Sequence, residues 1–234
     1  MLRNYKIMTA MGIKPKTIIH VGSHYGQDNK QYELLKVENI FWCEADPICA
    51  SELRSRYPKS RVIEGVFWSV VGKKMEFWIM KNRAQNSLFP PKFYQESVEK
   101  QYVFTTTLDR EFRDVKLVPP IMLVLDVQGA EIEVLRGANK LLLSVNFVIC
   151  EITESSSISE FSVTQLKIEQ LLKPRGFRNS IRRWSYSKEY FDQLYVNISI
   201  FQRLRIVLIE LVYRIYLLLE RLTAKLKKSS LGAR

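Results

Sequence analysis

Three acidic residues, Glu44, Asp126 and Glu151, each follow a short run of apolar residues. Apolar runs of this length predict strands that are buried on both faces of a sheet. The carboxyl ends of parallel strands meet at one edge, which is where open α/β sheets bind their ligands. Three strands that end in an acid therefore predict a polar site at that edge.

Two glycines, Gly22 and Gly26, follow another β-branched run, residues 17–21. A helix with Tyr32, Leu34 and Leu35 as buried residues is expected next. A glycine has no Cβ, so a turn of this kind lets the backbone approach a nucleotide closely. The spacing is neither G-x-G-x-x-G nor a P-loop, which would also need a lysine. The glycines alone fit an ordinary tight turn better.

Glu44 changes this interpretation because it lies 22 positions after Gly22. A spacing of about 20 residues is typical of the acid on the second strand that binds a ribose in nucleotide-binding α/β folds. A carboxylate accepts hydrogen bonds from both ribose hydroxyls. The alternative is a solvated acid at the end of a strand. Together the glycines and the acid indicate an adenosine-type ligand.

The elements that position these residues alternate between strands and helices, as in one α/β domain. Residues 81–100 lack periodicity and are expected to form an irregular loop, either a substrate-binding loop or a plain surface excursion. The expected helices are 1–16, 47–57 (with Leu53 inward), 131–143 and 163–173, and the expected strands are 17–21, 39–44, 61–66, 75–80, 121–126, 146–151, 178–184 and 194–200.

The net charge of +12 is concentrated near the carboxyl terminus. Residues 173–234 carry 14 Lys or Arg and 4 Asp or Glu, a net +10, so a globally basic nucleic-acid enzyme is not indicated. The cysteines, Cys43, Cys49 and Cys150, are odd in number and lack a zinc-type spacing, so we expect reduced cysteines and no metal. The amino terminus has no apolar signal region, which predicts a cytoplasmic protein.

Residues 199–228 combine Ile, Leu, Val and Tyr with charges at Arg203, Glu210, Arg214 and Arg221. Steps of 7, 4 and 7 residues place these charges on one helix face, which predicts a basic amphipathic helix over 201–234 beside a domain of residues 1–200. Charges this frequent exclude a spanning helix. Three roles stay open: packing on its own domain, self-association or another partner contact, and binding to the inner membrane surface through its lysines.

Several motifs together resemble the FkbM family of S-adenosylmethionine-dependent methyltransferases. They are Val21–Gln27, Glu44–Pro47, Asn86–Leu88, Thr107–Asp109 and the most specific block, Leu125–Ala138. The resemblance covers roughly residues 17–200. It implies a class I methyltransferase fold, which is a Rossmann-like, mostly parallel seven-stranded sheet with helices on both faces and the last strand inserted antiparallel.

The resemblance also implies the cofactor, S-adenosyl-L-methionine, and the residues that bind it. Gly22, Ser23, His24 and Gly26 match positions at the methionine part, and Glu44 matches the ribose acid. The family pattern has Asp at the position of His20 and Asn at that of His24, so these two histidines depart from it. The full set of expected cofactor-binding residues is Gly22, Ser23, His24, Gly26, Gln27, Glu44, Ala45, Asp46, Ser69 and Asp126.

The implied reaction is O-methylation of a sugar or another small hydroxylated metabolite. Alignment of the acceptor with the methyl carbon is the main catalytic requirement, and a base that removes the hydroxyl proton helps. Asp126, His24 and Glu151 are the candidates for this base. A dehydrogenase is disfavoured by the absent G-x-G-x-x-G. The alternatives that stay open are an RNA methyltransferase, although an aromatic–basic recognition motif is lacking, and a non-catalytic module that binds a nucleotide.

Overall fold

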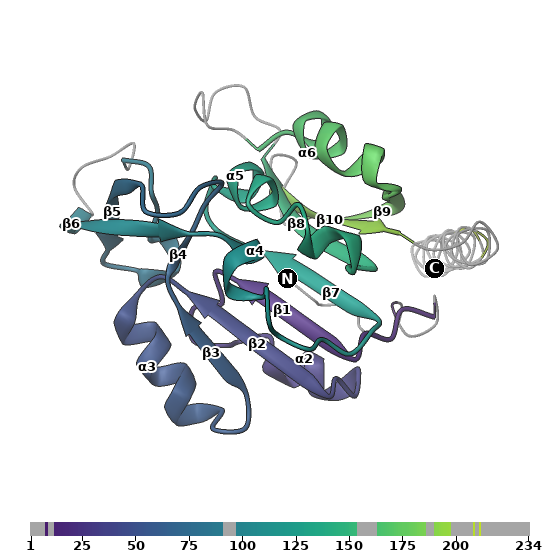
Figure 1. The fold of residues 1–234 in the computed structure, drawn as a ribbon, viewed down its shortest axis with the longest axis horizontal. Coiled ribbons are helices and arrows are strands. Elements are labelled where there is room, and N and C mark those ends of the chain that lie inside the picture. Colours follow the sequence, from purple (N-terminus) through teal and green to yellow (C-terminus); the bar gives the residue numbers. More distant parts are fainter. Residues whose placement is uncertain are drawn as a thin grey trace, which may run out of the picture.

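The computed structural model describes residues 8, 12–90, 97–153, 163–185, 190–197, 208 and 211. Its main sheet has seven strands in the order β3-β2-β1-β7-β8-β10-β9. Figure 1 shows these strands side by side, from β3 at the lower left to β9 at the upper right. The strands are β1 (Thr17–Val21), β2 (Asn39–Glu44), β3 (Arg61–Glu64), β7 (Ile121–Leu125), β8 (Phe147–Thr153), β9 (Arg178–Ser185) and β10 (Tyr190–Val196).

The strand directions confirm the predicted class I methyltransferase architecture. β1 pairs in parallel with both β2 and β7, and β7 pairs in parallel with β8. The last strand, β10, lies between β8 and β9 and is antiparallel to both. β3 also pairs in parallel with β2, so five strands bring their carboxyl ends, and the residues that follow them, to one edge of the sheet.

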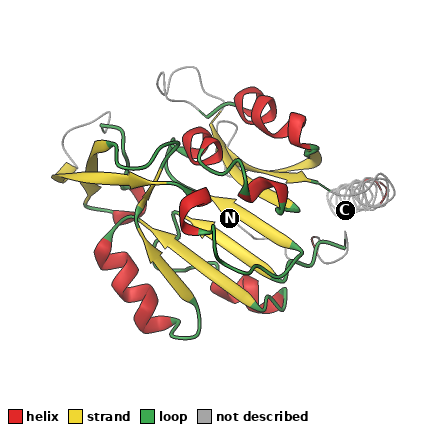
Figure 2. Cartoon of the chain, in the orientation of Figure 1, coloured by secondary structure: helices red, strands yellow, loops and turns green. Residues whose placement is uncertain are grey.

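Helices cover both faces of this sheet (Figure 2). Ile19 and Leu123 belong to one core, with α4 (Leu108–Glu111), α5 (Glu131–Arg136) and α6 (Gln165–Leu172). Their neighbours Ile18 and Met122 belong to the other core, with α2 (Asn29–Leu34) and α3 (Pro47–Arg56). Successive residues of a strand face opposite sides, so a continuous apolar run is what a sheet covered twice requires.

Helix α3 begins where the sequence dictates. Asp46 is its N-cap, and its side chain accepts a hydrogen bond from the Ile48 backbone N–H at 2.9 Å. Pro47 follows at the first helical position, where its missing N–H and fixed φ angle do no harm. Leu53 is buried as predicted. The helix begins directly after β2, so its cap lies at the sheet edge that carries Glu44.

A second, three-stranded sheet lies between β3 and β7 along the chain, in the order β4-β6-β5. Its strands are β4 (Val66–Phe67), β5 (Lys74–Met80) and β6 (Ser97–Thr106), with the short helix η1 (Arg83–Gln85) after β5. The prediction of an irregular loop over 81–100 was wrong at the carboxyl end of that range, whereas β5 ends at Met80 as predicted. β6 begins at Ser97, and it pairs with β5 through long-range contacts that local periodicity does not reveal.

Other boundaries also differ from the prediction. Leu34 is 53% exposed, whereas Tyr32 and Leu35 are buried as expected, because residues three apart share one face of a helix and Leu34 lies off that face. β8 continues past Glu151 to Thr153, and β10 begins at Tyr190 rather than at 194. The predicted helix over 131–143 is divided into α5 and the short helix η3 (Leu141–Leu143).

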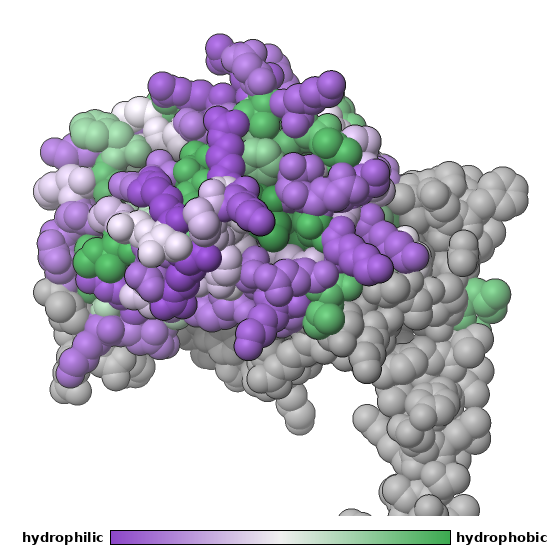
Figure 3. Space-filling view, turned by 90° about the horizontal axis from the view of Figure 1, so that it is seen from below, coloured by the Kyte–Doolittle hydropathy of each residue, from purple (hydrophilic) through white to green (hydrophobic). Residues whose placement is uncertain are grey.

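The two ends of the chain carry predictions that the structure does not test. Most of the expected helix over 1–16, and all but two residues of the expected helix over 201–234, lie outside the described residues. Within the described part, no helix is long and apolar enough to cross a membrane. On the face in Figure 3, hydrophilic side chains dominate and apolar ones form groups between them, as on an ordinary solvent-facing surface.

Candidate functional site

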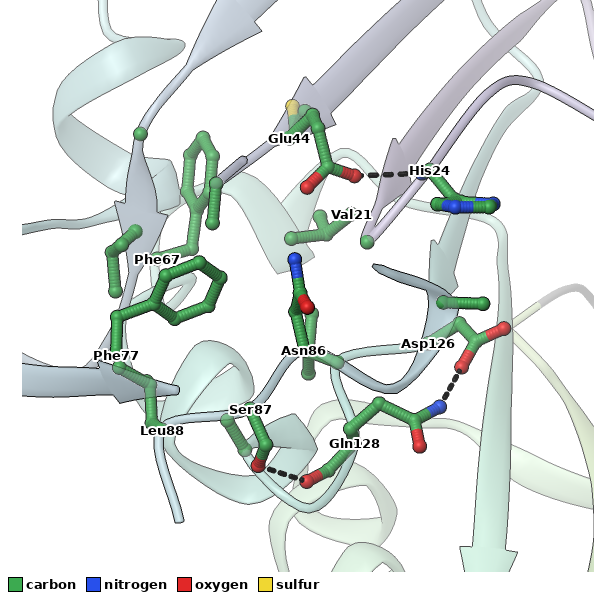
Figure 4. A pocket seen from close by; sticks show the side chains of 18 of the residues that line it. Val21, His24, Glu44, Phe67, Phe77, Asn86, Ser87, Leu88, Asp126 and Gln128 are labelled. Atoms are coloured by element: carbon green, nitrogen blue, oxygen red, sulfur yellow. Dashed lines mark hydrogen bonds between the residues drawn. The ribbon is translucent and has the colours of Figure 1, made fainter. Parts of the chain in front are cut away.

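A cavity lies at the carboxyl edge of the main sheet, where β1, β2 and β7 end (Figure 4). The second sheet and the segment after β5 complete its wall. Its lining residues are Val21, Gly22, His24, Cys43, Glu44, Ala45, Gly65, Val66, Phe67, Phe77, Arg83, Ala84, Asn86, Ser87, Leu88, Asp126, Val127, Gln128 and Ala130. Of the three acids predicted to share a site at this edge, Glu44 and Asp126 line the cavity and Glu151 does not.

Gly22 joins the loops after β1 and β7. Its φ angle is +79°, and a Cβ built on it lies 1.8 Å from the backbone oxygen of Asp126. The Asp126 N–H in turn donates to the Val21 oxygen at 3.0 Å. Any other residue at this position clashes with the β7 loop and is strained in its backbone. This glycine therefore sets the distance between the two loops that border the cavity.

Glu44 is buried and held by backbone donors. One carboxylate oxygen accepts from the His24 N–H at 2.6 Å and the other from the Asp46 N–H at 2.9 Å. Burial raises the pKa of Glu44 to about 7, and these N–H groups oppose the rise. Each carboxylate oxygen has a second lone pair, so both are able to accept a hydrogen bond from a ligand in the cavity.

Apolar side chains form the part of the cavity beside Glu44. Val66 and Phe67 come from β4, Phe77 from β5 and Leu88 from the segment after η1. In Figure 4 the rings of Phe67 and Phe77 lie next to each other on one side of the cavity. Sequence reasoning missed all four residues. Val66 and Phe67 were the one available signal. They come shortly after β3, which is parallel to β2 and ends at the same edge of the sheet.

The remaining predicted cofactor-binding residues divide into two groups. Ala45 lines the cavity, whereas Ser23, Gly26, Gln27, Asp46 and Ser69 are not among the lining residues. The Ser23 hydroxyl donates to the Cys43 oxygen at 3.3 Å. A Cβ on Gly26 meets the ring of Tyr57 at 2.5 Å, so this glycine makes room for an aromatic side chain. Asp46 binds Arg83 and Asn86 instead.

His24 lines the cavity with a neutral ring, because burial lowers its pKa. Its Nδ1 lies 2.5 Å from Nε2 of Gln27. If the Gln27 amide donates, the ring proton is on Nε2, and that atom is a donor rather than a base.

His20 lies below the cavity in β1, with its ring nitrogen Nδ1 2.8 Å from the Tyr32 hydroxyl. Burial lowers the pKa of His20 to about 4, so it is an uncharged core residue.

Acidic side chains gather at the other end of the same edge. Asp126 follows β7, and the register of β7 with β8 places Glu151 beside it. Asp192 of β10 is the antiparallel partner of Glu151 and is buried. Burial raises the pKa of Asp126, and burial together with Asp126, Glu131 and Asp192 raises the pKa of Glu151. These carboxyls therefore hold protons at a higher pH than exposed ones do.

Glu131 supports the Asp126 loop from below. Its carboxylate accepts from the Val127 N–H at 2.9 Å and from the Gly129 N–H at 3.0 Å. Burial raises the pKa of Glu131 to about 7. Gln128 has a φ angle of +51°, and its side-chain amide donates to Asp126 Oδ1 at 2.9 Å. Asp126 is thus held in place by its own loop.

Among the described residues, no group of three His, Cys, Asp or Glu side chains could hold a metal ion.

Comparisons with known proteins agree with this geometry. The model of the methyltransferase FkbM domain matches residues 20–179. No curated protein sequence matches the chain. Among solved structures, a SAM-dependent methyltransferase from Aquifex aeolicus is similar, with 11% identity, a TM-score of 0.46 and coverage of 82% of this chain and 88% of that one. Aeropyrum pernix fibrillarin with bound S-adenosyl-L-methionine has 12% identity, a TM-score of 0.45 and coverage of 77% and 66%.

Proposed function

The chain belongs to the methyltransferase FkbM domain family, and from this premise we propose that it methylates a hydroxyl oxygen of a sugar or another small hydroxylated metabolite. Membership confirms the predicted enzyme class and the cofactor, S-adenosyl-L-methionine. The observation that carries the finer proposal is the position of Asp126. It is a partly buried carboxylate with a raised pKa that lines the cavity and is fixed by Gln128.

The polar and apolar groups of the cavity fit this cofactor. Glu44 is placed to accept hydrogen bonds from the ribose hydroxyls, since both its oxygens keep a free lone pair. Phe67, Phe77 and Leu88 offer apolar surface to the adenine ring. Gly22 and His24 border the region that remains for the methionine part. When bound, the cofactor supplies an electrophilic methyl group.

Asp126 is the base in this proposal. Its carboxylate accepts the proton that the acceptor hydroxyl loses as the new carbon–oxygen bond forms. A base is most effective when its pKa lies near the working pH, and burial moves Asp126 in that direction. Glu151, next to it, is the second acidic group at this end and the first candidate to receive the proton afterwards.

A labelled-methyl assay tests the proposal. The full chain is incubated with S-adenosyl-L-methionine carrying an isotope-labelled methyl group and with separate pools of monosaccharides, glycolipids, carboxylic acids, amines and RNA. We expect label on a hydroxyl oxygen, located by mass spectrometry. Label on RNA supports the alternative of an RNA methyltransferase. Cofactor binding without formation of S-adenosylhomocysteine in any pool supports a non-catalytic binding module.

The carboxyl-terminal segment, residues 201–234, belongs to a separate proposal. Its basic amphipathic pattern supports contact with an anionic membrane surface or with a second copy of the chain. Truncation after Ile200 should leave a domain that binds the cofactor and has lost liposome binding or self-association. An insoluble truncated chain, together with a monomeric full chain that ignores anionic liposomes, would assign the segment to the core.

A further inference from the structure

One wall of the cavity is a segment that lies outside the strands of the main sheet. Residues 82–88, called the strap here, follow β5 and include η1. Five of them, Arg83, Ala84, Asn86, Ser87 and Leu88, line the cavity. Figure 4 shows Ser87 and Leu88 across the cavity from Glu44, with Asn86 between.

The first attachment of the strap is to Asp46. Its Oδ2 accepts from Asn86 Nδ2 at 2.8 Å and from a guanidinium N–H of Arg83, while its Oδ1 caps α3 at Ile48. Asp46 is 1% exposed. The Asn86 oxygen accepts from the Met80 N–H at 2.8 Å, so this side chain also holds the strap to β5. This buried carboxylate therefore accepts three hydrogen bonds from the protein, and it is not among the residues that line the cavity.

The second attachment is to the loop after β7. The Ser87 hydroxyl donates to the backbone carbonyl oxygen of Gln128 at 3.1 Å and accepts from the Phe89 N–H at 3.1 Å. The backbone of Ser87 forms a bridge to Trp78 of β5. Gln128 is also the residue whose side chain donates to Asp126. The strap thus connects the loop that follows Glu44 with the loop that holds Asp126.

We propose that Asp46, Arg83 and Asn86 are positioning residues: they hold the strap as a wall of the cofactor cavity and thereby slow cofactor release. The inference rests on the proposed binding of S-adenosyl-L-methionine in this cavity. The sequence predicted that Asp46 contacts the cofactor. The geometry instead gives its carboxylate to the strap, so that its effect on the cofactor passes through Arg83 and Asn86.

Removal of Arg83 or Asn86 leaves the buried carboxylate of Asp46 with fewer hydrogen-bond donors. The loss of a charge-assisted hydrogen bond costs more free energy than the loss of a neutral one. The strap then opens more often. For Arg83→Ala and Asn86→Ala we expect S-adenosylhomocysteine to dissociate about 10-fold faster. Arg83→Lys keeps the charge and should restore part of the slow release. Arg54→Ala is the matched control, since Arg54 pairs with Glu64 at 3.0 Å on the exposed side of α3.

Two measurements on the full chain separate positioning from direct contact. Stopped-flow displacement gives the dissociation rate of S-adenosylhomocysteine. Limited trypsin digestion, with and without this ligand, gives the rate of cleavage after Lys81, an exposed residue directly before the strap. We expect Arg83→Ala and Asn86→Ala to be cut faster than the wild type even without ligand, and Arg54→Ala to match the wild type in both measurements.

The outcomes are distinct. Faster ligand release together with faster cleavage after Lys81 supports the proposal. Faster ligand release with unchanged cleavage after Lys81 means that these side chains contact the ligand directly, and this result overturns the proposal. Unchanged cleavage of the ligand-free variants also overturns the proposal. A wild-type chain that binds no S-adenosylhomocysteine overturns the proposed cofactor site, whereas the ligand-free digestion still decides whether Asp46 holds the strap.

Discussion

Glu44 in one half of the sheet edge and Glu151 in the other have different neighbours. In the cofactor half, formed by the loops after β1 and β2, Glu44 is surrounded by backbone N–H groups that lower its pKa against the effect of burial. In the acid half, formed by Asp126, Glu131, Glu151 and Asp192, burial and the neighbouring carboxylates raise the pKa of Glu151 together. Burial raises the pKa of both Glu44 and Glu151; the neighbours of Glu44 oppose that rise, whereas the neighbours of Glu151 add to it.

This difference separates binding from proton chemistry. Fixed donors around Glu44 keep its oxygens in one place, as a group that accepts hydrogen bonds from a ligand should be. Carboxylates that raise one another's pKa exchange protons near neutral pH, as a base and its proton acceptor should. The comparison predicts that mutations in the two halves affect different measurements.

The largest expected effect is that of Asp126→Asn on turnover. The substitution keeps the shape of the side chain and removes the carboxylate that takes the proton, so turnover should fall by about 10²- to 10⁴-fold. Affinity for S-adenosylhomocysteine, measured by titration calorimetry, should stay within about 3-fold of the wild type. A loss of turnover at unchanged affinity indicates a residue that acts in the reaction step. A parallel loss of affinity would make Asp126 a cofactor ligand.

Glu44→Ala should show the reverse pattern. It removes a buried acceptor of the proposed ribose contact, so affinity for S-adenosylhomocysteine should weaken by roughly 1.5–3 kcal/mol. Glu64→Ala is the matched control, because Glu64 ends the neighbouring strand β3 and is exposed. Unchanged affinity of a folded Glu44→Ala variant, in the same calorimetric titration, would remove Glu44 from the site.

The cofactor half was the more predictable of the two from sequence. Gly22 and Glu44 are fixed by local chemistry: a tight turn that needs a glycine and an acid that directly follows a buried strand. The seven-stranded, mostly parallel sheet with its antiparallel last strand followed from the family resemblance. Because the acids at three strand ends could be seen in the sequence, Asp126 and Glu151 were also predicted to lie at one edge.

The strap and the second sheet could not be predicted in the same way. Phe77 lies in a predicted strand, but its place in the cavity depends on the pairing of β5 with β6, about 25 residues later in the chain. Arg83 and Asn86 lie in a segment without periodicity, and their role depends on Asp46, which is 37 and 40 positions away. Contacts of this range are set by tertiary packing rather than by local pattern.

The raised pKa values along this edge should also make stability depend on pH. Folding raises the pKa of Glu44 and of Glu131 to about 7 and raises that of Glu151, so the folded chain binds protons that the unfolded chain has lost. The resulting stability is present at low pH and is lost as the pH rises through the raised pKa values. The two histidines have lowered pKa values and act in the opposite sense below about pH 6.5. We therefore expect the free energy of unfolding to fall between pH 6.5 and 8.

Glu151→Gln tests this origin. The amide does not titrate, so the fall between pH 6.5 and 8 should shrink by about 1 kcal/mol in chemical denaturation. Glu76→Gln serves as the control, since Glu76 forms a surface pair with Lys100 at 2.8 Å and lies on the second sheet. An equal slope in both variants would place the titrating group elsewhere.

The smallest expected effect is that of His24→Asn, and it tests whether the two halves are separate. The contribution of His24 to the cofactor half is its backbone N–H, which donates to Glu44 whatever the side chain is. Its φ angle is +49°, a left-handed conformation that Asn tolerates better than most residues. Asn also retains a side-chain donor near the cavity. Both affinity and turnover should therefore remain within about 3-fold of the wild type.

Turnover of His24→Asn decides between the two candidate bases. If the ring of His24 removed the acceptor proton, the variant should lose activity to the same extent as Asp126→Asn, because Asn is not a base. If Asp126 alone has this role, the pH dependence of kcat should be the same in His24→Asn and in the wild type. A large loss of kcat at unchanged cofactor affinity would move the base from the acid half to the cofactor half, and the separation of binding from proton chemistry would no longer hold.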